Sequence, residues 1–244
     1  MFAVLSHLAL IGGWFAFVHI GDVPRFIMPS PSATLEALLS SRYGWGENTL
    51  VTAVEILVGY VLAVVCGVAL ALLFTWSKTL EAWLFPLIVT LNMIPKVALG
   101  PVVILWLKYG ILPNTILAFS IAVFPILLTT ARGLRQTDPE LLDLVRSLRG
   151  SRWQLFTKIQ LPGSLPYLFA GMKVSAVLAV AGAIVGEFLG SERGLGYLML
   201  QVQVTLDTAA MFAAIVLITA IGMLLYGAVL WLERIFVPVD ARVT

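Results

Sequence analysis

Six long apolar runs constrain this sequence more than any other feature does. In the hydrocarbon of a bilayer every backbone polar group needs an internal partner, so a spanning segment is a helix or a strand of a closed barrel. The runs do not alternate, and they approach or exceed the length of about 20 residues that a helix needs to cross. They cover about 2–19, 50–74, 83–107, 111–130, 165–185 and 209–232. The sequence therefore predicts an all-α, polytopic membrane protein with six transmembrane helices in a single domain, residues 1–244.

The composition excludes several other classes of protein. Apolar residues make up 60% of the 244 residues and charged residues only 11%, whereas a soluble domain carries about 25% charged residues. A net charge of +2 gives no indication of nucleic-acid binding. The single cysteine, Cys66, cannot form an internal disulfide, and no nucleotide-binding glycine loop or metal-ligand cluster is present. We expect no catalytic residue, no metal and no cofactor in this chain.

The loops between the runs carry an uneven distribution of lysine and arginine. If the N-terminus is cytoplasmic, nine basic residues fall on the inner side and four on the outer side. Cytoplasmic loops are enriched in Lys and Arg, so we expect both termini to be cytoplasmic. The first run lacks a basic leader and a cleavage site, which favours a retained helix over a signal peptide.

The inner loop at about 136–162 is the most charged stretch of the chain. Asp138 is suited to cap a helix that starts with Pro139, and apolar residues follow with helical spacing. Gly150 then interrupts the helix, and a second short helix is expected from Ser151 until Leu161–Pro162 ends it. Its apolar side would hold Trp153, Phe156 and Ile159. The pair either lies on the lipid surface or docks a soluble partner, and the residue pattern alone leaves both open.

This loop resembles the coupling loop of ABC-importer permeases, the so-called EAA loop. The segment that carries the resemblance is RSLRGSRWQLFTKIQLP at 146–162. Three further stretches are similar to the nitrate/sulfonate/taurine permease family: residues 29–32, residues 94–101 with Leu105 and Trp106, and residues 186–191 with 194–197. The resemblance covers nearly the whole chain, and it implies the type I ABC-importer permease fold.

The resemblance also implies partners and a function. The chain would be a non-catalytic permease subunit in the bacterial inner membrane, paired with a second permease subunit, expected to be an identical copy. A cytoplasmic ATPase dimer would bind ATP and magnesium, and an extracytoplasmic solute-binding protein would deliver the solute. The expected solute is a small anion such as a sulfonate, taurine or nitrate. The alternatives are a thiamine precursor, riboflavin or an aromatic acid, and, in a different class, a secondary transporter that works alone.

The resemblance assigns contact with the ATPase to residues of the inner loop. The family's Glu-Ala-Ala triplet is Asp143-Leu144-Val145 here, and the glycine that normally follows is replaced by Arg149, with Gly150 one position later. Since glycine permits a positive φ, this displacement leaves the geometry of the turn open. The bulkier triplet leads to the hypothesis of a matched ATPase groove. The assigned residues are Asp143, Leu144, Val145, Arg146, Leu148, Arg149, Gly150, Ser151, Arg152, Trp153 and Phe156.

Polar residues inside the third run are candidates for the translocation path. Lys96 lies about halfway along the run, and Pro95 before it frees the carbonyl of Leu91. Asn92 precedes Lys96 by four residues, so a continuous helix would place both on one face. Such a face, beside a kink, could line a path for an anion. The alternative is a lysine that is neutralised by a partner or that extends toward the interface.

Three other charged residues lie in or near the spans. Glu187, assigned to the path or its gate, could cap the short outer helix, pair across the dimer, or pair with Arg193, and the sequence does not decide between these roles. Glu55 is interpreted as a carboxylate at the membrane interface. Lys173 is interpreted as a lysine that extends from the inner end of its span toward the interface.

Overall fold

The structure, a computed structural model, describes residues 2–136 and 139–238, apart from the side chains at 2–4, 7, 139, 142, 144 and 146. This part of the chain is almost entirely helical and contains no strand. A 3-10 turn at Ser41–Tyr43 and a π-helical stretch at Phe156–Gln160 interrupt the α-helices. The α-helices are α1 Phe2–Ile20, α2 Pro31–Leu39, α3 Trp45–Trp76, α4 Lys78–Met93, α5 Lys96–Leu107, α6 Ile111–Arg135, α7 Pro139–Ser147, α8 Arg152–Leu155, α9 Leu161–Gly190, α10 Leu195–Val204 and α11 Thr208–Phe236.

Four helices are long and apolar enough to cross a membrane. They are α3, α6, α11 and the continuous stretch Arg152–Gly190 that contains α9, and they correspond to the second, fourth, sixth and fifth predicted spans. The predicted third span is not one straight helix, because α4 and α5 meet at 95°. In α1, the uninterrupted stretch with described side chains, Leu8–Ile20, is shorter than a crossing requires. The expected count of six is therefore not confirmed: the described residues give four spans, or five if the bent pair is one.

Small residues hold the centre of the bundle together. Helix α6 lies between α3 and α9, and these three helices make the most extensive contacts in the molecule. A Cβ atom added at Gly59 of α3 would lie 2.7 Å from the Cβ of Ala118 of α6, and one added at Gly182 of α9 would lie 2.7 Å from the Ala118 Cα. The backbones therefore approach as closely as helices of a membrane bundle can when small residues face each other.

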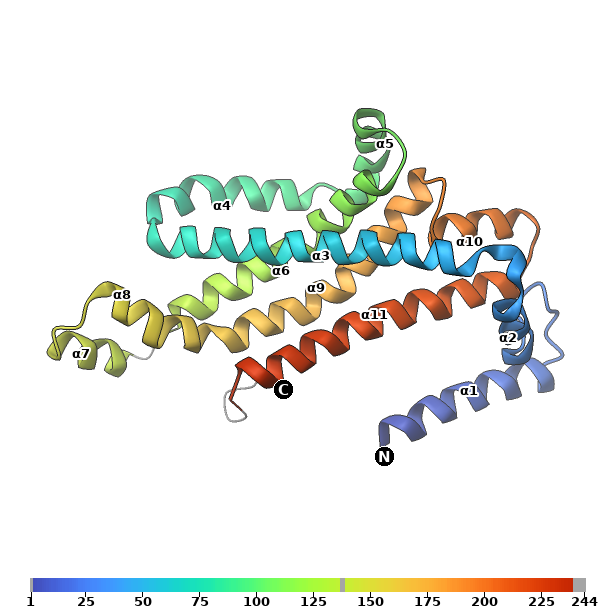
Figure 1. The fold of residues 1–244 in the computed structure, drawn as a ribbon, viewed down its shortest axis with the longest axis horizontal. Helices are drawn as coiled ribbons and strands as arrows, with labels where there is room; N and C mark the ends of the chain where they lie inside the picture. The colour runs from blue at the N-terminus through green and yellow to red at the C-terminus, as the bar shows by residue number, and fades with distance from the viewer. Residues whose placement is uncertain (1, 137–138, 239–244) are drawn as a thin grey trace.

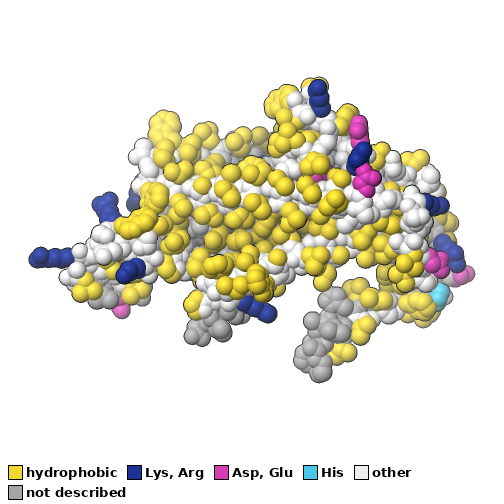
Figure 2. Space-filling model, in the orientation of Figure 1, with side chains coloured by type: hydrophobic (Ala, Val, Ile, Leu, Met, Phe, Trp, Pro, Cys, Tyr) yellow, Lys and Arg dark blue, Asp and Glu magenta, His cyan; other side chains and the backbone are white. Residues whose placement is uncertain are grey.

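On the face shown in Figure 2 the long flank of the molecule is largely apolar, and most charged side chains lie toward its two ends. Helices α7 and α8 form one end, whereas α2 and α10 lie at the other (Figure 1). Helix α1 stands apart from the bundle in the same view and is tied to it through Trp14, whose indole donates to Pro29 O at 3.0 Å and packs against Phe212. Apolar flanks with polar ends suit a chain whose middle is solvated by lipid.

Candidate functional site

The turn after α7 has the backbone geometry that the inner loop was expected to need. Arg149 adopts a φ of +51°, and the N–H of Gly150 donates to Val145 O at 2.8 Å. This is the hydrogen bond of a Schellman motif, in which the residue with positive φ is usually glycine. Arg149 stands where related permeases are expected to carry that glycine. The displaced glycine therefore leaves the turn intact, with an arginine in the left-handed position.

Gly150 has a steric role in the same turn. A Cβ atom at this position would lie 2.6 Å from Cγ1 of Val145, so the β-branched residue of the altered triplet and the glycine at 150 fit together. A side chain at position 150 would therefore have to displace Val145.

Helix α8 begins with a capping box that our sequence analysis did not identify. The Ser151 hydroxyl accepts from Gln154 N at 3.2 Å, and Ser151 N donates to Gln154 Oε1 at 2.8 Å. The signal was present in the sequence as a serine followed three residues later by a glutamine. The box fixes the direction in which α8 leaves the turn.

An exposed apolar surface, edged with arginines, is presented at the α7–α8 end. Leu148 is 73% exposed and Trp153 65% exposed, with Arg149 and Arg152 exposed beside them. Phe156 is buried between two aromatic neighbours, with its ring 5.5 Å from that of Trp76 and 5.8 Å from that of Trp153. The two rings lie on one side of the helix, as predicted, but only Trp153 is exposed, because Phe156 anchors α8 to the bundle.

The second helix of the inner loop does not end at Leu161–Pro162, contrary to the prediction. It passes through the π-helical stretch Phe156–Gln160 directly into α9. The N–H of Leu161 donates to Phe156 O, and this wider turn absorbs the missing donor of Pro162. The coupling segment and a transmembrane helix thus form one continuous element. The predicted cap Asp138 lies outside the described residues, as do the side chains of Leu144 and Arg146, while Asp143 is exposed on α7.

The break between α4 and α5 holds the residues predicted for the path. The Lys96 ammonium donates to Leu91 O at 2.6 Å, the carbonyl that Pro95 frees. Asn92 and Lys96 do not share a helix face, because the chain turns sharply between them. Both nevertheless line one cavity of about 440 Å³, together with Pro95 and with residues of α6 and α9: Ile121, Phe124, Pro125 and Leu178.

Glu187 lies buried near the end of α9 and caps the start of α10. Its Oε2 atom accepts from the backbone N–H of Gly196 and, at 3.3 Å, from that of Tyr197. Its Oε1 atom accepts from the Thr52 hydroxyl at 2.5 Å. Of the roles that the sequence left open, the described contacts are those of a helix cap. Arg193 does not pair with Glu187, since it donates to Glu47 at 2.7 Å.

Glu55 and Lys173 are placed differently from what the sequence predicted. Glu55 is fully buried and accepts from the Asn114 amide of α6 at 2.9 Å, so it is not an interfacial carboxylate. Lys173 forms an ion pair with Glu233 of α11 at 3.1 Å, with only 16% of the lysine side chain exposed. Each partner lies about sixty residues away in the sequence, where no local pattern could indicate it.

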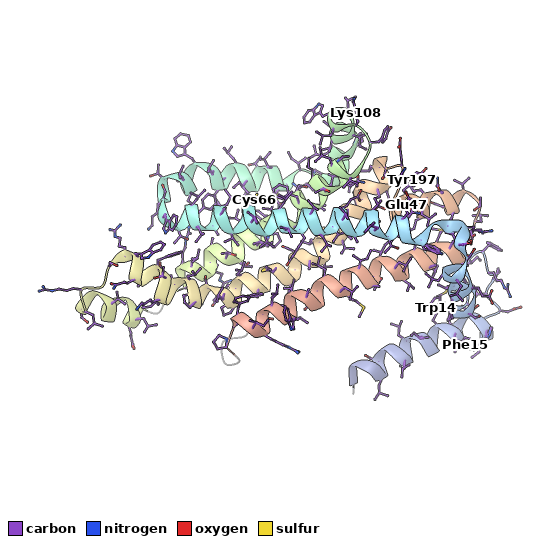
Figure 3. All side chains as sticks on the ribbon, viewed as in Figure 1. Trp14, Phe15, Glu47, Cys66, Lys108 and Tyr197 are labelled. Atoms are coloured by element: carbon purple, nitrogen blue, oxygen red, sulfur yellow. The ribbon has the colours of Figure 1, made fainter. Side chains whose placement is uncertain are left out.

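Polar side chains surround the end of the bundle that carries α2 and α10. Asp207 caps α11 and accepts from Arg42 at 2.5 Å and from the Tyr43 hydroxyl at 2.6 Å. Burial raises the pKa of Asp207, but the hydrogen bonds from Tyr43, the Ala210 N–H and Arg42 outweigh it and hold that pKa below its usual value. Glu47 and Tyr197, labelled in Figure 3, line the same open cavity of about 930 Å³ as Asp207 does.

Three proteins of known family are similar to the chain over most of its length. It is 34% identical to a probable ABC transporter permease protein of Haemophilus influenzae, and the alignment covers 92% of this chain and 91% of the relative. It is 31% identical to the formylaminopyrimidine transport permease protein ThiX of Halalkalibacterium halodurans, over 87% and 86% of the two chains. It is 33% identical to the riboflavin transport system permease protein RibX of Chloroflexus aurantiacus, over 96% and 88%.

The fold has a counterpart among solved structures. A chain of the inward-facing MetNI methionine ABC transporter superposes with a TM-score of 0.66 at 17% identity, covering 78% of this chain and 95% of the other. The family profile of the binding-protein-dependent transport system inner membrane component matches residues 59–237. The chain therefore belongs to this family of ABC-transporter permeases, whose members are non-catalytic membrane subunits of the transporter.

Proposed function

We propose that the α7–α8 surface transmits ATP-driven movements of a cytoplasmic ABC ATPase to the spans, so that the permease imports a small solute. The observation that carries this proposal is the exposed Trp153 and Leu148, held at fixed angles by the turn at Arg149 and the capping box of Ser151. An apolar centre with a charged rim is the usual composition of a protein interface. The alternative is that α7 and α8 are an amphipathic helix pair lying on the lipid surface. That arrangement would not require such a defined turn between them.

The assembly proposed around this chain follows from its family. A second copy of the chain completes the permease, and an external binding protein delivers the solute to the end that carries α2 and α10. The ends of α1 and α11 that bear the termini point toward the α7–α8 end (Figure 1). This direction supports cytoplasmic termini in a bacterial inner membrane.

The coupling proposal is tested with Trp153→Ala in proteoliposomes that contain the permease, its ATPase and the binding protein. We expect solute uptake to fall at least tenfold, because the aromatic anchor of the ATPase contact is lost, while the amount of permease in the membrane stays unchanged. Trp231→Ala is the matched control, since Trp231 is 63% exposed but lies on the flank formed by α11. Equal uptake by the two variants would refute the proposal, as would vanadate-insensitive uptake without an ATPase.

For the solute, we propose a small nitrogen heterocycle of the pyrimidine or flavin class. The support is the identity above 30% with permeases named for formylaminopyrimidine and riboflavin. A small anion is the second candidate, because the ammonium of Lys96 lines the cavity at the α4–α5 break. A permease named for aliphatic sulfonates is 28% identical.

Uptake by Lys96→Met separates the two solutes. If the solute is an anion, the variant should lose most uptake while assembling normally, because the charge that would attract the anion is gone. A heterocycle should be transported at close to the original rate. The direct measurement is uptake of labelled formylaminopyrimidine against labelled taurine and nitrate by the complete transporter.

A further inference from the structure

Two buried carboxyl groups meet at the end of the bundle far from α7 and α8. Glu55 of α3 is 0% exposed and Glu187 of α9 is 1% exposed. Their surroundings are shared, because Thr52, one turn before Glu55 on α3, donates to Glu187, and Asn114, which donates to Glu55, lies against Gly186 of α9. Neither the family assignment nor the proposed transport requires two acids at this place. Charges of like sign in a low-dielectric interior repel strongly unless a cation or a proton intervenes.

Glu187 has the surroundings of an ionised carboxylate. Its oxygens accept from the Thr52 hydroxyl and from the N–H groups of Gly196 and Tyr197, and Thr52 in turn accepts from Leu195 N at 2.8 Å. The N–H groups belong to the first turn of α10, where the helix dipole also favours negative charge. Hydrogen-bond donors therefore face both oxygens.

Glu55 has the surroundings of a neutral acid. Its Oε1 atom accepts a single hydrogen bond, from Asn114, and its Oε2 atom is buried without a hydrogen-bond partner. Asn114 Oδ1 is also buried without one and faces α9, since a Cβ at Gly186 would lie 2.7 Å from it. No donor approaches Glu55 Oε2, and its neighbours Glu187 and Asn114 offer acceptor oxygens. Glu55 Oε2 is therefore the atom that can carry a proton.

The charged and titratable groups around the pair offer no counter-ion among the described residues. Helix α3 contributes Thr52 and Asn48, α6 contributes Asn114 and Thr115, and α10 contributes backbone N–H groups. Tyr60 of α3 donates to Met172 O at 3.1 Å, Tyr109 lies against Gly190, and Arg193 is exposed and paired with Glu47. The exposed Glu192 and Lys108 and the Arg42–Asp207 pair complete the surrounding groups.

We infer that Glu55 and Glu187 form a proton-binding site, in which Glu55 carries one proton and donates it to the Glu187 carboxylate. The shared proton removes the repulsion between two buried acids and ties α3 to α9 and α10. If these helices separate, water reaches Glu55 and the proton can leave. The site is thus a proton-dependent clamp on this end of the bundle, and it does not depend on the identity of the solute or on coupling to the ATPase.

Infrared spectroscopy of the purified transporter tests where the proton is. We expect the wild-type protein to show the carbonyl band of a protonated carboxyl, with the small shift that deuterium exchange produces. Glu55→Gln should lose this band and keep its fold, because glutamine has nearly the shape of the neutral acid. Glu36→Gln is the control, since Glu36 is exposed on α2, and it should leave the band unchanged. A band that survives in Glu55→Gln overturns the proposal.

Thermal unfolding of the same complexes gives a second, independent measurement. Glu55→Gln should unfold within about 2 °C of the wild type at neutral pH, whereas Glu187→Gln should unfold lower by roughly 5 °C, because an amide cannot accept from all three donors. The wild type should lose more stability than Glu55→Gln does as the pH rises above the pKa of an unfolded glutamate, about 4.3. Equal losses in the two variants at neutral pH overturn the proposal, because Glu55 would then be ionised.

The same measurement distinguishes a proton from a metal cation. Unfolding is compared in sodium chloride and in choline chloride of equal ionic strength. We expect no difference between the two salts. A rise of the unfolding temperature in sodium that disappears in Glu55→Gln would mean that the pair binds a sodium ion, and the assignment to a proton would be wrong.

Discussion

Arg149 adopts a backbone conformation that is less favourable for arginine than for glycine. Its φ of +51° brings Cβ close to the following carbonyl oxygen, which costs about 1–2 kcal/mol for a residue with a side chain. The turn survives because the Gly150 hydrogen bond to Val145 O and the capping box of Ser151 fix the chain on both sides. We therefore expect Arg149 to contribute through its exposed side chain, at the proposed contact with the ATPase.

This argument predicts that Arg149→Gly stabilises the protein while weakening its contact with the ATPase. We expect a gain of about 1 kcal/mol in the free energy of unfolding, measured by thermal or denaturant melts, and weaker co-purification of the ATPase. Arg152→Gly is the control, because residue 152 is helical and glycine should destabilise it. A loss of stability in Arg149→Gly would contradict the geometry of the turn.

Asp207 supplies a pH-dependent contribution to stability at the opposite end. Because its pKa is held below the usual value, the contribution is complete above the pKa of an unfolded aspartate, about 3.9. It is lost as the pH falls through the lowered pKa. Asp207→Asn keeps the helix cap and should be less stable than the wild type at pH 7, with the difference vanishing in acid. Thermal unfolding measured across this range checks the sign, and a difference that grows in acid would disprove it.

At the scale of helices, α6 serves as the spacer between α3 and α9. Ala118 is buried between Gly59 and Gly182. The distances from the axis of α6 to those of α3 and α9 are therefore set by two glycines and one alanine. The buried ion pair of Lys173 and Glu233 adds a polar contact between α9 and α11. Apolar surface alone could not hold these helices in lipid, because lipid tails are as apolar as the helix faces are.

Gly182→Ala tests the close packing of α6 against α9. The new Cβ would lie 2.7 Å from the Ala118 Cα, which is backbone and cannot move aside, so we expect a loss of about 1–3 kcal/mol. Gly227→Ala is the matched control, since nothing lies within 4 Å of a Cβ at that position of α11. Thermal unfolding of the two variants should differ in this order, and equal stabilities would mean that the helices can move apart freely.

The ion pair between α9 and α11 gives a second test. Lys173→Met should lower stability by about 3 kcal/mol, because it leaves the buried Glu233 without this counter-ion. Lys173→Met combined with Glu233→Leu should recover much of that loss, since both charges are then gone. A double variant that is less stable than the single one would contradict this account, and thermal unfolding decides between the two results.

For the whole molecule, local patterns predicted most of the fold and less of the site. Apolar runs located the four long spans, and Pro95 indicated the break that separates α4 from α5. The amphipathic pattern placed α7, but the passage from α8 into α9 was missed because Pro162 looked like a stop. The partners of Glu55 and Lys173 could not be predicted, because Asn114 and Glu233 come from helices far along the sequence.

The stretch from Arg152 to Gly190 is one continuous helical element of 39 residues, with a π-helical turn near its α8 end, and is about 58 Å long at 1.5 Å per residue. One end holds Trp153 and the other holds Glu187. A rod of this length acts as a lever: tilting it by about 5° about its α8 end would carry Glu187 by about 4–5 Å. Hydrogen bonds such as that from Thr52, 2.5 Å long, would not survive this displacement. A small rotation of the α8 end can therefore separate Glu187 from its hydrogen-bond donors and from Glu55 at the opposite end.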